Sequence, residues 1–334
     1  MKNRTYLLKP LLLAGAAALI TGQASADVTA RLGTSLPDAH PQTLGAQKFA
    51  ELVDEKTDGE ITVQVFSNGM LGSDVNMTSM VQSNTLDFTV PSTATLASLN
   101  PNFSIISLPF QFEDEAQAHE VLDGPVGQSL LASLQERGLE GLAFWENGFR
   151  QITNSRRPIE TLEDLDGLKV RTMENRVYID MFNDLGANAV PMPVNELFTA
   201  LETRTVDAQE NPYSVIDTKR FYEVQSYLSR TNHAYDAQVL VASQGFMDKL
   251  DDQQQQAVRE AAQEATRYQR AQSQELNAQL LETLGEQMTT NEVSPQERQR
   301  MQQQLTPMID NQFEALDPAL VADFKQAVAS DEGA

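Results

Sequence analysis

The sequence predicts an α/β protein built from two lobes. Short apolar segments with strand character alternate with segments whose apolar residues recur at helical spacing, and this order favours a parallel sheet with helices on both faces. The alternation restarts after Gly141, which indicates a second α/β unit. Roughly 300 residues follow an N-terminal leader, and a chain of that length usually divides into two lobes.

The first unit begins directly after the leader. Strands are expected at 28–34, 61–66 and 86–90, and helices at 42–57 and 74–82. Ser73 stands just before the second helix and suits its N-cap, while Asn68 and Gly69 mark a turn. Strands and helices therefore alternate through the first 90 residues.

The second unit repeats the pattern. Strands are expected at 142–145, 168–171 and 206–209, and helices at 176–185 and 194–202. Thr161 and Asp164 have the spacing of a capping box that starts a helical turn. Beyond Leu250 the chain is rich in Gln and Glu, with apolar residues at helical spacing. This predicts one long amphipathic helix and no strand after it.

The first 26 residues have the features of a signal peptide. Lys2, Arg4 and Lys9 precede a short apolar run, and small residues at Ala24 and Ala26 predict cleavage after Ala26 and export to the periplasm. A membrane anchor is the alternative, but the run is too short to span a bilayer. Cleavage removes three basic and no acidic residues, so the formal net charge falls from −23 to −26. Such a surface repels nucleic acid.

No catalytic or metal-binding constellation is evident in the sequence. The chain has no cysteine, which excludes thiol nucleophiles, disulfides and cysteine-ligated metals. The three histidines are widely spaced, and neither a nucleophile elbow nor a glycine-rich phosphate loop is present. We therefore expect no catalytic residues, no metal and no cofactor, and the sequence does not indicate an enzyme.

Two arginines have a context that suggests ligand binding. Arg171 ends the expected strand at 168–171, and Arg150 follows an aromatic segment at the start of the second unit. Ligands of α/β proteins bind at the carboxyl ends of parallel strands. A guanidinium there can hold a carboxylate through two parallel hydrogen bonds. The alternative for either arginine alone is a surface ion pair with one of the many acids.

A string of short motifs resembles the DctP family, the substrate-binding subunits of tripartite ATP-independent periplasmic (TRAP) transporters. The motifs stand in one order at 149–151, 153–155, 167–172 and 206–212. Similarity continues over nearly the whole chain after the leader, including the segments 71–74, 86–87, 108–110 and 221–225.

The resemblance implies a set of ligand-binding residues. Arg171 matches the family arginine that binds the ligand carboxylate, Arg150 matches a second, frequent arginine, and Asn211 matches the asparagine of the family's Q-E-N-P segment. Four further positions fall where relatives line the pocket: Gln238, Glu174, Asp74 and Ser92.

Asn147 and His40 complete the predicted site. Asn147, like Ser92, Thr95 and Gln238, is a short polar residue that suits a ligand with several hydroxyl groups. His40 follows the first strand on the predicted ligand edge. It is either a pocket residue or, as we favour, a helix-entry residue.

The substrate is expected to be a small organic acid, with a sugar acid favoured. Residues 145–150 and 201–205 resemble the branch of the family that takes uronates or keto-gulonates. Ser92 and Thr95 stand where sialic-acid binders carry a Glu and an Arg, which disfavours sialic acid. A C4-dicarboxylate is the alternative, because Arg150 and Arg171 could each hold one carboxylate.

The resemblance also implies the architecture and the partners. Hinge strands cross between two lobes that close on the ligand, and a long helix spans both. Lobe I would comprise 27–148 and 237–276, and lobe II 149–236 and 277–334. The partners would be the small and large membrane subunits of an ion-gradient-driven permease. The protein itself would be a monomer or a homodimer.

Three other functions stay open at this point. A periplasmic enzyme acting on a small acid would need an acid and base pair that the sequence does not define. A ligand-sensing subunit would use the same binding chemistry. The binding protein of an ATP-driven transporter would share the lobed architecture, but the motif string disfavours it.

Overall fold

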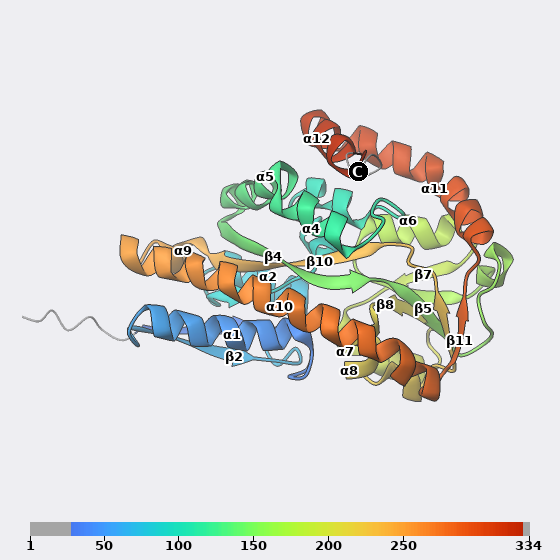
Figure 1. Cartoon of the computed structure of the whole chain (residues 1–334), viewed down its shortest axis with the longest axis horizontal. Helices are drawn as coiled ribbons and strands as arrows, with labels where there is room; N and C mark the ends of the chain where they lie inside the picture. Colours follow the sequence, from blue (N-terminus) through green and yellow to red (C-terminus); the bar gives the residue numbers. More distant parts are fainter. Residues whose placement is uncertain (1–27, 330–334) are drawn as a thin grey trace, which may run out of the picture.

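The computed structural model describes residues 28–329, so the expected leader at 1–26 and its cleavage site lie outside the described residues. The described chain forms two β-sheets surrounded by helices (Figure 1). This confirms the predicted two-lobed α/β class. No helix within this range is both long and apolar enough to cross a membrane.

The first sheet has the strand order β2-β1-β3-β10-β4. Its strands are β1 (Val28–Gly33), β2 (Ile61–Phe66), β3 (Phe88–Thr89), β4 (Leu139–Phe149) and β10 (Tyr235–Ser243). β1 runs parallel to β2 and β3, but β10 is antiparallel to β3 and β4. The parallel arrangement that the alternation favours holds for β1, β2 and β3 but not for β10, because local patterns do not reveal that the chain returns to this sheet through β10.

The second sheet has the order β11-β9-β5-β8-β6-β7. Its strands are β5 (Gln151–Asn154), β6 (Lys169–Thr172), β7 (Asn188–Pro191), β8 (Ala208–Asn211), β9 (Tyr227–Arg230) and β11 (Thr289–Glu292). β11 corrects the expectation that no strand follows the long helix. Its residues are polar and mostly exposed, so they lack the apolar alternation of a strand, and pairing with β9 defines it instead.

The chain crosses between the sheets at three places. β4 leads through Arg150 directly into β5, and the segment between β9 and β10 brings it back. The third crossing is α10 (Asp252–Gln287), which runs diagonally over both sheets (Figure 1). Strands of the first sheet thus come from 28–149 and 235–243, and those of the second from 151–230 and 289–292.

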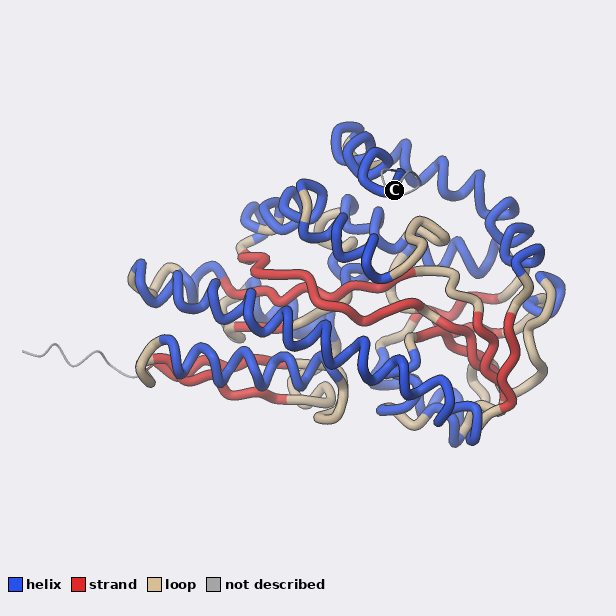
Figure 2. Tube along the Cα trace, in the orientation of Figure 1, coloured by secondary structure: helices blue, strands red, loops and turns tan. Residues whose placement is uncertain are grey.

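The other helices cover the faces of the sheets (Figure 2). They are α1 (Pro41–Lys56), α2 (Asp74–Gln82), α3 (Thr93–Leu96), α4 (Glu115–Asp123), α5 (Pro125–Ser133), α6 (Arg176–Asp184), α7 (Val194–Glu202), α8 (Tyr213–Thr218), α9 (Gln244–Met247), α11 (Pro295–Ala315) and α12 (Pro318–Ala329). Four short 3₁₀ helices add Pro101–Ser107, Gln135–Arg137, Leu162–Leu165 and Phe221–Glu223. Ser73 caps α2 as predicted, since its side chain accepts from the Asn76 backbone N–H.

The long helix α10 joins the two halves of the molecule. Its capping box at Asp251 starts it, and its apolar stripe at 258–265 packs against α1 and β4. Farther along, the buried Gln269 side chain donates to the Glu146 carbonyl oxygen at 2.6 Å and accepts from the Glu146 N–H at 2.9 Å. Its end reaches α8 and β11 of the second half. Hydrogen bonds therefore attach the helix directly to the strand that crosses between the sheets.

The last two helices pack on different parts of the fold. α11 contacts α6, and α12 contacts α4 and α5. These two helices lie together on one side of the molecule in Figure 2. Since α12 packs on helices of the first unit, the C-terminal segment is shared between the two halves.

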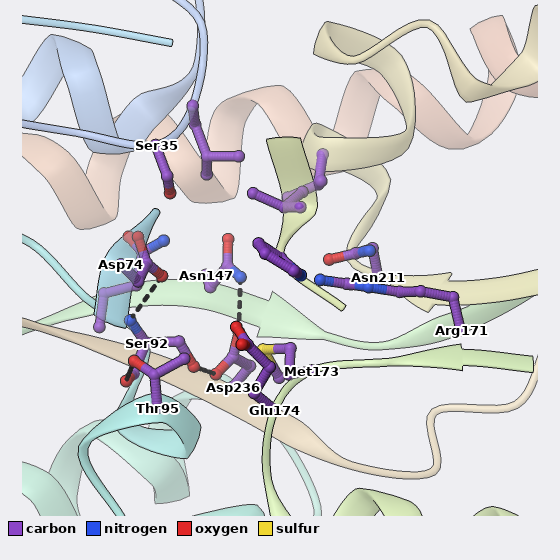
Figure 3. Close-up of a pocket in the computed structure, with 15 residues that line it drawn as sticks. Ser35, Asp74, Ser92, Thr95, Asn147, Arg171, Met173, Glu174, Asn211 and Asp236 are labelled. Atoms are coloured by element: carbon purple, nitrogen blue, oxygen red, sulfur yellow. Dashed lines mark hydrogen bonds between the residues drawn. The ribbon is translucent and has the colours of Figure 1, made fainter. Parts of the chain in front are cut away.

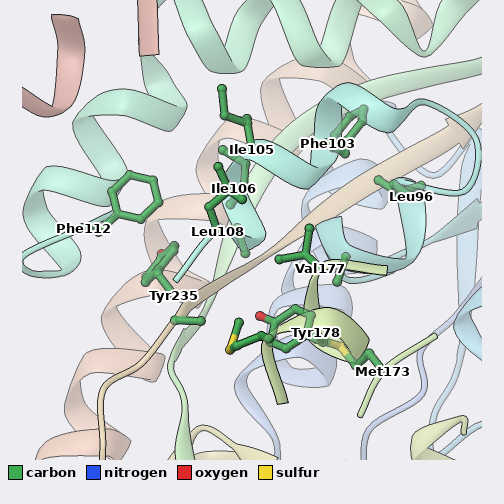
Figure 4. Packing of buried hydrophobic residues seen from close by; sticks show 14 of the residues in the cluster. Leu96, Phe103, Ile105, Ile106, Leu108, Phe112, Met173, Val177, Tyr178 and Tyr235 are labelled. Carbon is green, nitrogen blue, oxygen red and sulfur yellow. The ribbon is translucent and has the colours of Figure 1, made fainter. Parts of the chain in front are cut away.

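The largest apolar cluster runs continuously between the two sheets. Ile106 and Phe103 from the segment 101–107 pack near Val177 and Tyr178 of α6 (Figure 4). Tyr235 at the start of β10 belongs to the same cluster. Tyr178 in this cluster is fully buried, and its ring provides an aromatic face for the guanidinium of Arg150.

Candidate functional site

A cavity lies between the two sheets. It takes residues from strand ends of both sheets and from the starts of α2 and α3. The space open to the centre of a water-sized sphere is about 40 Å³, so the cavity is narrow. The lining residues are Ser35, Leu36, Asp74, Ser92, Thr95, Asn147, Arg171, Met173, Glu174, Pro193, Val194, Asn211, Val215, Asp236 and Gln238 (Figure 3).

The cavity collects most of the residues that the sequence singled out. Seven of the nine predicted site residues line it, and they are Asp74, Ser92, Asn147, Arg171, Glu174, Asn211 and Gln238. Arg150 and His40 do not line it. These seven residues come from segments spread over more than 160 positions, which the fold brings to one place.

Arg171 is a buried cation without a counter-ion among the described residues. It lies on β6, and its side chain extends toward the centre of the cavity beside Asn211 (Figure 3). Its Nε and Nη2 donate to the Met192 carbonyl oxygen at 2.9 and 2.7 Å. Burial lowers the pKa of Arg171 to about 10, so the guanidinium is charged at neutral pH. A buried charge without a partner is unfavourable, and the site therefore favours an anion at this position.

Arg150, in contrast, is held on several sides by other residues. Its Nη2 donates to Glu210 Oε1 at 2.9 Å and to the Glu210 carbonyl oxygen at 2.6 Å, and its Nε also donates to the Glu210 carboxylate. Nη1 donates to Asp236 Oδ2 at 2.9 Å, and the guanidinium lies 5.3 Å from the centre of the Tyr178 ring. Burial by itself lowers the pKa of Arg150, but these neighbours outweigh it and raise the pKa.

Asp236 is the main residue that the sequence analysis missed. It lines the cavity at the start of β10 and is almost fully buried. Ser92 Oγ donates to its Oδ1 at 2.6 Å, and Asn147 Nδ2 donates to its Oδ2 at 2.6 Å (Figure 3). Burial raises the pKa of Asp236, although Arg150 and the two polar donors oppose the shift. One carboxylate among 47 acidic residues carries no sequence signal of its own.

Glu210, the partner of Arg150, was also missed, although it stands within the Q-E-N-P segment. It is fully buried, and His233 Nε2 lies 3.3 Å from its Oε2. Burial is the largest influence on Glu210 and raises its pKa, but Arg150 and His233 together, through charge and hydrogen bonds, outweigh burial and lower the pKa overall. Its position between Gln209 and Asn211 was the available signal, because a charged residue in a buried strand needs a buried partner.

Several acceptor oxygens in the cavity lack a donor from the described residues. They are Asp74 Oδ1, Asn147 Oδ1 and Gln238 Oε1, all buried. Burial, with a contribution from Asp236, raises the pKa of Asp74 to about 6. The cavity therefore combines one positive group, Arg171, with a set of acceptors on elements of the first sheet.

His40 caps a helix instead of lining the cavity, as we favoured. Its Nδ1 accepts from the Gln42 N–H at 3.0 Å, which caps α1. The proton therefore resides on Nε2, which donates to Ser214 Oγ at 3.2 Å. Burial lowers the pKa of His40 to about 3, so the ring is neutral.

Residues 28–329 contain no group of three or more histidines and carboxylates arranged to hold a metal ion. What the cavity offers is recognition: a guanidinium for an anion, and oxygen atoms that accept hydrogen bonds. Gly148, next to Asn147, has φ of +115°, a conformation that a side chain rarely adopts. Gly148 thus permits the β-bulge at which the pairing of β4 with β10 skips Asn147, beside the cavity.

Comparison with known proteins places the chain in a family. Residues 32–316 match the bacterial extracellular solute-binding proteins of family 7, DctP. The chain is 42% identical over 270 residues to the 2,3-diketo-L-gulonate-binding periplasmic protein YiaO of Escherichia coli strain K12, with 81% of each chain covered. It is 35% identical over 270 residues to the C4-dicarboxylate-binding protein DctB of Bacillus subtilis strain 168, with 80% of this chain and 77% of that protein covered.

A solved structure is similar to this chain in both sequence and fold. The sugar acid binding protein DctPAm from Advenella mimigardefordensis strain DPN7T, in complex with galactonate, superimposes with a TM-score of 0.89 at 41% identity. The match covers 91% of this chain and 98% of that one. Members of the family are extracellular or periplasmic binding proteins of TRAP transporters and are not enzymes. Since the match spans most of its length, this chain belongs to the DctP family of TRAP solute-binding proteins.

Proposed function

We propose that this protein captures a sugar acid in the periplasm and delivers it to a TRAP permease. The ligand carboxylate binds Arg171, with Asn211 beside it, and the remaining lining residues contact the rest of the ligand. The relative from Escherichia coli, named for 2,3-diketo-L-gulonate, and the galactonate complex from Advenella support this ligand class.

The observation that carries the proposal is the environment of Arg171. Its guanidinium is buried, lines the cavity and forms no ion pair within the described residues. A carboxylate bound to this buried guanidinium gains charge-assisted hydrogen bonds, which are stronger in a buried site than in solution. One carboxylate on the ligand therefore completes the charge balance of Arg171.

A C4-dicarboxylate is the second candidate, because the relative from Bacillus subtilis is named for that class. Binding of a dicarboxylate requires a second cation in the cavity for the second carboxylate. Arg150 was the expected cation, but Glu210 and Asp236 already hold it and it does not line the cavity. The geometry thus favours an acid with one carboxylate.

Delivery implies partners and a maturation step outside the described residues. We propose that the small and large membrane subunits of the permease receive the closed, loaded protein, and that the leader is cleaved after Ala26. We propose that the lobes that close are 27–148 with 237–276 and 149–236 with the residues from 277 onward, except that α12, which packs on α4 and α5, moves with the first lobe. A role as a ligand-sensing subunit would use the same cavity, and co-purification with the permease subunits distinguishes the two roles.

The experiment that tests the proposal is a ligand screen of the chain that starts at Asp27. Thermal unfolding is measured with galactonate, glucuronate, 2,3-diketo-L-gulonate, succinate, malate and N-acetylneuraminate, because a ligand that binds only the folded state raises the Tm. We expect the largest rise with a sugar acid, and we expect that acid to be recovered chemically unchanged.

Two variants connect the result to the site. Arg171→Met should abolish the rise in Tm, whereas Arg176→Met, which changes an exposed arginine on α6, should preserve it. A rise in Tm with succinate or malate alone would instead establish a C4-dicarboxylate as the ligand. Chemical conversion of the acid would contradict the binding-protein proposal.

A further inference from the structure

Three residues that the sequence analysis assigned to ligand binding also converge on one carboxylate of the protein. Ser92, Asn147 and Arg150 all donate hydrogen bonds to Asp236, at 2.6, 2.6 and 2.9 Å. They come from the start of α3, from β4 and from the crossing between β4 and β5. Such a set of donors positions the Asp236 carboxylate firmly within the cavity wall.

A second carboxylate belongs to the same wall. Asp74 lines the cavity, and the Ser92 backbone N–H donates to its Oδ2 at 3.4 Å. Ser92 therefore contacts both carboxylates, one through its backbone and one through its hydroxyl group (Figure 3). Between them, Asp74 and Asp236 place acidic groups on the part of the cavity built by the first sheet and its helices.

The wall also presents oxygen atoms that need donors. Asp74 Oδ1, Asn147 Oδ1 and Gln238 Oε1 are buried and receive no hydrogen bond from the described residues. A buried acceptor without a donor is unfavourable, so a fitting ligand supplies hydrogen atoms at this wall. Hydroxyl groups supply them. A carboxylate supplies none and would place a negative charge beside two acids.

We propose that Asp236, together with Asp74, is a specificity determinant that restricts the cavity to acids with a single carboxylate and hydroxyl groups along the rest of the carbon chain. This inference rests on the proposed function, because it assumes that Arg171 binds the ligand carboxylate. Arg150 is then a positioning residue: it holds Asp236 in place and does not touch the ligand.

Matched ligands isolate the effect of a second carboxylate. Galactonate and galactarate share a six-carbon chain with the same hydroxyl configuration and differ at one end, as do gluconate and glucarate. Isothermal titration calorimetry at fixed pH and ionic strength measures both pairs, and the acids of the ligand screen are included. We expect each monocarboxylate to bind at least about thirtyfold more tightly than its dicarboxylate partner, because like charges brought together cost several kcal/mol.

Variants then test whether the Asp236 and Asp74 carboxylates cause the preference for monocarboxylates. Asp236→Asn and Asp74→Asn each remove one negative charge, and each should reduce the preference for the monocarboxylate by at least about threefold. Asp180→Asn, on the surface of α6, should leave the preference unchanged. If Asp236→Asn does not fold, as judged by circular dichroism, Asp74→Asn alone tests the charge effect.

The outcomes separate this inference from the proposed function. If the tightest ligand carries two carboxylates, or if the members of a pair bind equally, the specificity role of Asp236 and Asp74 is wrong while acid binding stands. A preference for the monocarboxylate that is unchanged in both Asn variants likewise contradicts the specificity role of Asp236 and Asp74. If no acid binds the wild-type protein, the proposed function fails and this inference fails with it.

Discussion

Arg150 and Arg171 are both buried, yet their surroundings differ completely. Arg150 has two carboxylates, a backbone carbonyl and an aromatic ring around its guanidinium. Arg171 has one backbone carbonyl and the cavity. The difference shows in the electrostatics: the neighbours of Arg150 raise its pKa, and burial lowers the pKa of Arg171.

The comparison separates a structural charge from a functional one. Arg150 balances Glu210 and Asp236 in the folded chain, so its contribution is expected mainly in stability. Arg171 has no such partner in the described residues, so its burial is unfavourable until an anion arrives. We propose that the two arginines have different roles, and substitutions at each should then produce opposite patterns.

The largest effect is expected for Arg150→Met. Removing this guanidinium leaves Glu210 and Asp236 buried without their cation, and breaking a buried ion pair in this way costs about 3–5 kcal/mol. Denaturant unfolding of the ligand-free protein measures the loss. Arg150→Lys keeps the charge but not the two-pronged contact, and should fall between the variant and the wild type. A loss below about 1 kcal/mol for Arg150→Met would show that the ion cluster is not structural.

Arg171→Met should give the opposite pattern. We expect binding of the sugar acid to weaken by about thirtyfold to several thousandfold, corresponding to about 2–5 kcal/mol. The free energy of unfolding of the ligand-free protein should stay the same or rise, because an unpaired buried charge is removed. Calorimetric titration and denaturant unfolding measure the two quantities. Strong destabilisation without loss of affinity would reverse the assigned roles.

Asp74 provides a negative counterpart to Arg171, and pH reveals it. The pKa of Asp74 is raised to about 6 from an ordinary value of 3.8, so the folded state binds more protons than the unfolded state between these values. The contribution of Asp74 to the free energy of unfolding therefore falls as pH rises from about 4 to 6. Asp74→Asn should be more stable than the wild type by about 3 kcal/mol at pH 7 and nearly equal to it at pH 4.

The predicted pH dependence of the Asp74 contribution is tested against a control variant. Unfolding is measured for both proteins across the range, and the difference between them cancels the titration of other groups. Asp180→Asn is the matched control on α6. A constant difference between wild type and Asp74→Asn would show that Asp74 titrates normally.

The smallest effect is expected for an exposed arginine. Arg300 on α11 pairs with Glu163 and Glu297, and its side chain is 45% exposed. Ion pairs in such positions contribute about 0.2–1 kcal/mol and are screened by salt. Arg300→Met should therefore cost at most about 1 kcal/mol at low salt and less at high salt, whereas the loss in Arg150→Met should be insensitive to salt. Equal salt sensitivity in the two variants would contradict the burial argument.

Local chemistry explains why some elements were predictable. The bounds of α2 and α7 agree with the expected ones, and α1 and α6 are each within one residue, because caps and apolar spacing act over a few neighbouring positions. β11 was unpredictable for the converse reason. Its polar sequence contains no strand pattern, and its conformation depends on β9, about 60 residues earlier in the chain.

The residues of the candidate site also differ in whether a local stretch of sequence identifies them. Arg171 and Asn211 were recognised from motifs that stand within short stretches of chain. Asp236 was not, because its importance comes from donors located 86, 89 and 144 positions away. A residue whose role depends on such distant contacts has no local signature in so acidic a chain.

The amino-acid sequence alone was sufficient for the α/β class, the long helix, the exclusion of thiol chemistry and the family. Each of these depends on composition, periodicity or motifs that a single stretch of chain carries. The folded chain was needed to decide which arginine faces the cavity. The ionic partners of Arg150 lie 60 and 86 positions away, and only the packing of both sheets brings them within hydrogen-bonding distance, where burial makes pairing decisive.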